Sequence, residues 1–190
     1  MNYSDRCLGL FNGTVPPGTT PARVADTVRH KGLVPEEMLS FDSTITTVEQ
    51  YYSPNPFLSP LLREGKRWLE KNDFEYEWLW KSSIPISEKQ KKLMTALQYS
   101  PVGVSVDAWN IKDGRYIKLN EQDNHWTVCY GYVEEEFWKI FDSYEPYRKN
   151  LDWNYDFGMA MRYSIIKRLQ RTYFFGFLST YFDIWNRLTK

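Results

Sequence analysis

The stretch DNHWTVCYGY at residues 123–132, followed by FWKIFDSY at residues 137–144, decides how this part of the chain folds. Side chains alternate in character along both stretches, as is typical of β-strands, and the acidic run Glu134–Glu136 between them predicts a hairpin turn. His125 stands near the start of the first strand and Asp142 at the end of the second. Because a hairpin pairs the start of its first strand with the end of its second, we expect these two side chains to lie side by side.

A histidine beside a carboxylate can act as a general base, with the carboxylate fixing the orientation of the imidazole. We expect Asp142 to accept the Nδ1 proton of His125, which would leave Nε2 facing a cleft, and we expect Trp126 or Tyr144 to cover the pair. The alternative is a histidine that only satisfies the hydrogen-bonding needs of a turn carboxylate. Catalysis would also require a nucleophile on the other side of the cleft.

The chain has two cysteines, and neither stands where that nucleophile is expected. Cys129 alternates with Trp126 and Val128 in the strand pattern, which favours a small buried hydrophobic side chain. Cys7 lacks a preceding glycine-rich turn and a long helix whose N-terminus could lower its pKa. We therefore rank Cys7 as a poor candidate nucleophile.

The composition argues against several classes of protein. The 190 residues include 24 basic and 24 acidic side chains, so there is no excess of positive charge to bind nucleic acid. The presence of only two histidines argues against a histidine-rich metal site, and we expect neither a metal nor another cofactor. The length fits one domain or two closely packed lobes. Aromatic residues make up 17% of the chain and either fill a core or line a cleft for extended peptides or sugars.

Targeting signals are not recognisable in the sequence. The first residues lack the basic start and the apolar run of a signal peptide. The longest aromatic and apolar run, at residues 173–185, is too short to span a bilayer. The compartment therefore stays open, with the cytoplasm as the default.

Local patterns predict a helix-containing first part and a sheet in the second part of the chain. Pro21 near the start and Gly32 just past the end favour a helix at residues 21–29, and Ser87 is the expected N-cap of a later helix. Residues 35–60 carry several prolines and are expected to be mostly loop. A further helix is expected at residues 61–71, and strands at residues 74–81, 102–109 and 115–119, which together indicate an α+β fold.

The C-terminal segment has a character of its own. Basic residues flank the apolar run at residues 173–185, and we expect residues 161–190 to form an apolar or amphipathic helical tail. Such a helix could dock on this or another protein, or it could lie in a membrane surface. Either contact would be made through residues 172–185.

Several blocks of the sequence resemble, in order, the papain-like cysteine peptidases, the group with a Cys-His-Asn/Asp triad, and in particular their bacterial and phage-type branch. The segment Ser4-Asp5-Arg6 is similar to the Ser-Glu-Gln segment of that family. The resemblance covers about residues 4–150. The other matching blocks lie at residues 18–37, 38–42, 96–108, 124–132 and 138–144, the last two resembling the family's histidine strand and its Trp-x-x-x-Asn-Ser-Trp segment.

The resemblance implies a papain-like fold with an incomplete helical lobe and an antiparallel sheet lobe over residues 1–160, followed by the helical tail at residues 161–190. It implies peptide or protein substrates, no metal and no cofactor. It also implies that His125 and Asp142 are catalytic. The substrate-binding residues that it implies are Val104, Asp107, Ala108, Trp109, Asn124, Trp126 and Tyr144.

The chain departs from the family pattern in ways that bear on activity. The third triad position is Asp142 instead of the usual Asn, and Tyr144 replaces the following Trp. The family's nucleophilic Cys and its oxyanion-hole Gln belong to a block that precedes the Ser4 segment, so we expect an N-terminally shortened peptidase that is inactive, or nearly so, in isolation. The alternatives are a non-enzymatic binding protein on a peptidase scaffold, and amidase or transglutaminase chemistry on the same triad.

Overall fold

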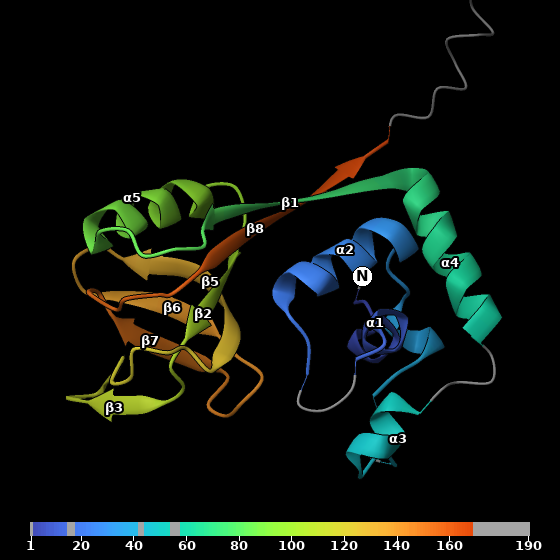
Figure 1. Ribbon diagram of the computed structural model, residues 1–190, viewed down its shortest axis with the longest axis horizontal. Coiled ribbons are helices and arrows are strands. Elements are labelled where there is room, and N and C mark those ends of the chain that lie inside the picture. Colours follow the sequence, from blue (N-terminus) through green and yellow to red (C-terminus); the bar gives the residue numbers. More distant parts are fainter. Residues whose placement is uncertain (1, 15–17, 42–43, 54–57, 169–190) are drawn as a thin grey trace, which may run out of the picture. The chain divides into compact units, whose positions relative to one another are not determined.

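The structure is a computed structural model that describes residues 2–14, 18–41, 44–53 and 58–168 (Figure 1). The chain folds into two compact units, a helical unit within Met1–Asp73 and Ile165–Lys190 and a sheet unit at Phe74–Ser164. None of the helices in the described ranges is both long enough and apolar enough to cross a membrane.

The helical unit begins with two capped helices. Ser4 accepts a hydrogen bond from the backbone N–H of Cys7 and so caps helix α1 (Asp5–Asn12). Thr20 caps α2 (Pro21–Lys31) in the same way, with Pro21 in the first turn and Gly32 just after the last residue. The helix predicted at residues 21–29 is therefore confirmed, together with its start and stop signals.

The region predicted as mostly loop contains two short helical elements, η1 (Glu36–Met38) and α3 (Val48–Tyr52). Helix α3 was not predicted because helices were assigned from apolar periodicity, whereas this short helix is fixed by a capping box. The Thr47 side chain accepts from the backbone of Gln50, and the Gln50 side chain accepts from the backbone of Thr47. A further helix of the unit, α4 (Leu58–Lys71), includes the helix predicted at residues 61–71.

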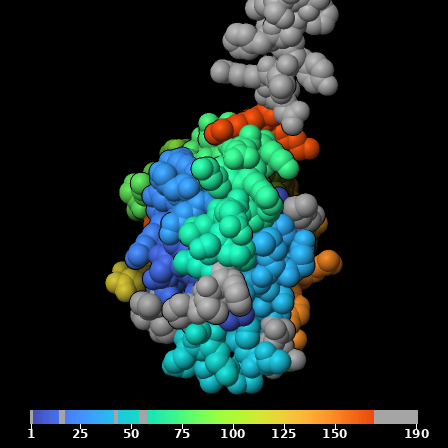
Figure 2. All heavy atoms as spheres, turned by 90° about the vertical axis from the view of Figure 1, so that its right-hand side faces the viewer, coloured from blue at the N-terminus to red at the C-terminus, as the bar shows by residue number. Residues whose placement is uncertain are grey.

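The packing of α2 (Pro21–Lys31) against α4 (Leu58–Lys71) in the helical unit requires glycine at two positions. Helices α2 and α4 lie next to each other, with α4 on the face seen in Figure 2. A Cβ atom on Gly65 would stand 2.1 Å from the backbone oxygen of Lys31, and one on Gly32 would stand 2.0 Å from the backbone oxygen of Gly65. This close backbone approach explains why glycine occupies both positions. The buried apolar side chains of this unit include Cys7, Phe11, Val34, Leu39 and Leu61.

An eight-stranded sheet runs in the order β1-β8-β2-β5-β6-β7-β4-β3. Its strands are β1 (Asn72–Trp80), β2 (Val102–Val106), β3 (Asn110–Lys112), β4 (Arg115–Ile117), β5 (His125–Val133), β6 (Phe137–Phe141), β7 (Arg148–Asp152) and β8 (Ala160–Lys167). Strand β5 is antiparallel to both β2 and β6, and β7 is antiparallel to β6. The strands and the β5–β6 hairpin predicted from the sequence are thus present.

Helix α5 (Ile86–Leu97) packs against β2 and β5 (Figure 1). Its start differs from the prediction, because Pro85 rather than Ser87 is the N-cap residue and Ser87 lies inside the first turn. The fixed φ of proline suits this position and moves the helix start towards the N-terminus. Buried core residues of this unit include Leu93, Val102, Val104, Val106, Cys129, Trp138, Ile140, Leu151, Phe157 and Ala160.

The prediction of a helical tail from residue 161 is wrong for its described part. Residues Ala160–Lys167 form strand β8, which pairs with β2 through Val104↔Ala160 and Val102↔Arg162. Every residue of β2 is buried, so its backbone needs a hydrogen-bonded neighbour on both edges, and β8 provides the second one. The apolar run at residues 172–185 lies outside the described residues.

Candidate active site

The β5–β6 hairpin brings His125 and Asp142 together. His125 is the first residue of β5, and Asp142 directly follows β6. The strands are in register through Val128↔Phe141, so the start of one faces the end of the other. The imidazole Nε2 lies 2.7 Å from Oδ1 of Asp142, a hydrogen-bonding distance.

The ring nitrogen in this contact is the opposite of the one expected. Nε2, not Nδ1, faces the carboxylate. The imidazole reaches from β5 towards the residue after β6, and the nitrogen at the far end of the ring makes the contact. Among the described residues, Nδ1 has no hydrogen-bond partner, and the His125 side chain is 19% exposed. Nδ1 is therefore the nitrogen left to exchange a proton with another group.

Asp142 is held as a buried anion. Its side chain is 1% exposed, and Oδ1 also accepts a 2.8 Å hydrogen bond from the backbone N–H of Ser143. Burial by itself would raise the pKa of this carboxyl. The hydrogen bonds from His125 and Lys149 outweigh burial and lower the pKa below its usual value. Asp142 can therefore orient the imidazole as a carboxylate at neutral pH.

Lys149 completes the surroundings of Asp142, and it was not among the residues predicted from the sequence. It lies on β7 opposite Ile140, its side chain is 1% exposed, and its Nζ is 2.9 Å from Asp142 Oδ2. A signal for it was available in the sequence. Lys149 stands two residues before the buried Leu151 on a strand, so its side chain must point to the same buried face.

Aromatic rings enclose the imidazole. The ring of Tyr144 lies 5.3 Å from that of His125, and the ring of Trp109 lies 5.7 Å away, edge to face. Trp126 was the other residue expected to cover the pair. It follows His125 directly on β5, so its side chain points to the opposite face, where it packs against Trp78.

Two of the predicted substrate-binding residues are buried instead. Val104 is 0% exposed within the core of the sheet unit, and Asp107 is 1% exposed. Hydrogen bonds from the Asn120 side chain, then from the backbone at Asn120 and Leu119, lower the pKa of Asp107. Every residue of the strand that carries Val104 is buried, so Val104 is not open to a substrate. Asp107 is closed to a substrate as well, because its carboxylate is buried and accepts hydrogen bonds from Leu119 and Asn120.

Asn124 and Ala108, also predicted to bind substrate, brace the loop before His125. The Asn124 side-chain oxygen accepts a 2.9 Å hydrogen bond from the backbone N–H of Ala108, and its amide lies 3.3 Å from Oδ1 of Asp107. These contacts fix the start of β5. The structure therefore brings Trp109 and Tyr144 to His125, while Asn124, Ala108 and Asp107 shape the loop.

Both cysteines are poor nucleophiles in this structure. Cys7 is 1% exposed in the helical unit, and burial raises the pKa of its thiol to about 11. Cys129 is 0% exposed in the sheet unit, and burial raises the pKa of its thiol to about 12. Since the thiolate is the reactive form, neither side chain is activated at neutral pH.

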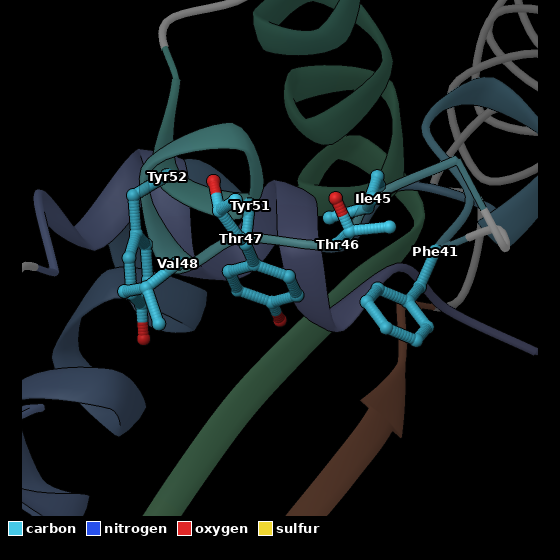
Figure 3. Close-up of a pocket in the computed structure, with 7 residues that line it drawn as sticks. All are labelled: Phe41, Ile45, Thr46, Thr47, Val48, Tyr51 and Tyr52. Carbon is cyan, nitrogen blue, oxygen red and sulfur yellow. The ribbon is translucent and has the colours of Figure 1, made fainter.

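A separate pocket of about 430 Å³ lies in the helical unit (Figure 3). It is lined by Phe41, Ile45, Thr46, Thr47, Val48, Tyr51 and Tyr52. Burial and the neighbouring Asp5 raise the pKa of Tyr51, so its phenol stays protonated. Within the described ranges, no three His, Cys, Asp or Glu side chains are grouped so that they could hold a metal ion. The His125 pair remains the candidate for chemistry.

Comparison with known proteins identifies the fold. The chain is similar to xylellain, a cysteine protease from Xylella fastidiosa, with a TM-score of 0.54 and 14% sequence identity, over 86% of this chain and 69% of that one. It is also similar to the bromelain protease from Ananas comosus, solved in complex with the E64 inhibitor, with a TM-score of 0.50 and 13% identity, over 88% and 78% of the two chains. The chain thus has the papain-like cysteine protease fold, as predicted. No family model and no curated protein sequence matches it.

Proposed function

We propose that the chain forms part of a papain-like cysteine peptidase domain, in which His125 is the general base and Asp142 orients it. The observation that supports this most directly is the 2.7 Å contact between Nε2 and Asp142 Oδ1. A carboxylate that accepts the Nε2 proton keeps Nδ1 unprotonated, which is the state that a base requires.

In this proposal, Nδ1 of His125 takes the proton of a cysteine thiol and later gives it to the leaving amine of a peptide. The thiolate attacks the peptide carbonyl, and water releases the acyl group. Tyr144 and Trp109 limit the access of water to the imidazole. The substrate class, peptides or proteins, follows from the protease fold together with this pair.

We further propose that the chain alone is inactive, because its two thiols are both buried and both have raised pKa values. The same observation favours the second candidate, a non-enzymatic binding protein on the peptidase scaffold. The two differ in whether a reactive cysteine joins His125 in the natural gene product.

The test compares the 190-residue chain with a product whose reading frame is extended upstream of Met1. Both are treated with an epoxide inhibitor of the E64 type and assayed with fluorogenic peptides. We expect no labelling of the 190-residue chain. The longer product should be labelled and should hydrolyse the peptides, and its His125→Ala variant should do neither. Cys7→Ser and Cys129→Ser serve as controls and should change neither result.

Three outcomes would contradict the proposal. Labelling of Cys7 in the 190-residue chain would overturn the assignment of this thiol as inert. Hydrolysis by the longer product that survives His125→Ala would remove the base from its role. A stop codon directly before Met1, with no labelling of any cysteine, would favour the binding protein over the peptidase.

A further inference from the structure

One buried cation touches the groups that surround the imidazole. The Nζ atom of Lys149 lies 2.9 Å from Asp142 Oδ2 and 2.6 Å from the backbone oxygen of Tyr144, and it sits 4.8 Å from the centre of the Trp109 ring. Asp142, Tyr144 and Trp109 all contact His125. Lys149 itself lies behind them, so it can act on the imidazole only through them.

The ammonium group is fully satisfied. A third hydrogen bond, of 2.7 Å, goes to the backbone oxygen of Pro146, so each of its three N–H groups has an acceptor. These bonds tie the segment from Asp142 to Pro146 to strand β7. The Lys149 side chain has little freedom, because it is 1% exposed and donates hydrogen bonds to three different residues.

A buried ion pair is weak evidence for a role in stability alone, since apolar residues of similar volume often serve the fold equally well. What such a pair can supply is a fixed geometry. Here Lys149 occupies Oδ2, and the backbone N–H of Ser143 occupies Oδ1. The carboxylate therefore cannot rotate without breaking charged hydrogen bonds, and Oδ1 stays directed at Nε2.

We propose that Lys149 is a positioning residue for His125, which fixes the Asp142 carboxylate so that the imidazole carries its proton on Nε2 and leaves Nδ1 free. The role in catalysis rests on the proposed function, but the positioning itself does not. The lysine charge also balances that of Asp142, so the imidazole lies beside a pair with no net charge.

This balance predicts which double substitution restores the geometry. Lys149→Met alone leaves Asp142 as an uncompensated buried anion, held at Oδ1 by the Ser143 N–H but with no donor left at Oδ2 to stop the carboxylate from turning. Asp142→Asn together with Lys149→Met removes both charges at once. Because the Ser143 N–H requires an acceptor at the Oδ1 position, the new amide should place its oxygen there and again accept the Nε2 proton.

The experiment measures the tautomer of His125 by ¹⁵N NMR of the 190-residue chain, with His30→Gln to assign the signals of the two histidines. In the unsubstituted protein with a neutral ring, we expect a protonated Nε2 and an unprotonated Nδ1, with widely separated resonances. In Lys149→Met the two resonances should move towards each other as both tautomers become populated. The double variant should restore the separation.

The matched control is Lys89→Met. Lys89 is also a buried lysine of the sheet unit, with a side chain 5% exposed, and it donates to Asp156 and to the backbone oxygen of Phe157. Its loss should lower the melting temperature without changing the His125 resonances. A mere loss of stability would therefore not imitate the expected result.

Two results would overturn the proposal: unchanged His125 resonances in Lys149→Met, or an equal change in Lys89→Met. If Lys149→Met does not fold, the double variant provides the test. It should fold and show the single His125 tautomer. A double variant that does not fold, or that shows both tautomers, would contradict the proposal. No activity is measured, so these results are independent of whether the peptidase assignment succeeds.

Discussion

Asp142 Oδ2 lies 2.9 Å from Nζ of Lys149, and both side chains are only 1% exposed. The two residues are on neighbouring strand ends, and their charges meet where water cannot screen them. Removing one partner from such a pair leaves the other charge buried without compensation, which costs far more than the pair itself contributes.

We therefore predict that Asp142→Asn strongly destabilises the sheet unit. The free energy of unfolding should fall by about 3–5 kcal/mol, because Lys149 keeps its charge and loses its anionic partner. Urea denaturation at neutral pH, followed by circular dichroism, measures this loss. The control is Glu88→Gln, since Glu88 pairs with Lys92 on the surface of the same unit and the two side chains are 48% and 44% exposed. It should cost about 1 kcal/mol or less, and equal losses in the two variants would refute the argument.

The acid sensitivity of the fold should also depend on Asp142. Burial opposes ionisation, but hydrogen bonds from His125 and Lys149 prevail, so the pKa of Asp142 is lower in the folded state than its value of about 3.9 in an unfolded chain. A lowered pKa in the folded state means that the stability from this group is present above about pH 4 and is lost as the pH falls through the folded value.

Consequently, urea midpoints measured from neutral pH down to about pH 3 should decline more steeply for the unsubstituted protein than for Asp142→Asn. Asp107, whose pKa is also lowered, is present in both proteins, so it does not account for the difference. Parallel declines would mean that His125 and Lys149 do not lower the pKa of Asp142 in the folded state.

The parts of this architecture that follow from local pattern were predictable. The alternation in residues 123–144 and the acidic turn predict the β5–β6 hairpin that brings His125 to Asp142, although the register shift between Cys129 and Gly131 was not predicted. The ring nitrogen involved was not predictable, because it depends on how far the side chain must reach. Strand β8 was missed because its conformation is set by pairing with β2, a tertiary contact that overrides local preference.

The errors at the candidate site have a related origin. Val104 and Asp107 were placed in a substrate wall by the resemblance, whereas the structure buries them within the sheet unit. Lys149 was overlooked because a lysine on a strand is usually exposed. The alternation along β7, in which Lys149 shares a face with the buried Leu151, was the available signal, and the Asp142 carboxylate explains how the buried charge is tolerated.

Close packing of α2 against α4 leaves no room for a side chain at Gly65. A Cβ on Gly65 would stand 2.1 Å from the backbone oxygen of Lys31, and backbone atoms cannot move aside as a flexible side chain can. Gly65→Ala should therefore lower the free energy of unfolding of the helical unit by about 1–3 kcal/mol, despite the higher helix propensity of alanine.

Gly9→Ala is the matched control in α1, where the added Cβ would lie 3.4 Å from the Tyr52 ring. It should be neutral or gain up to about 1 kcal/mol. Urea unfolding followed at the helical signal of circular dichroism compares the two, and a Gly65→Ala protein as stable as Gly9→Ala would show that the helices do not approach this closely.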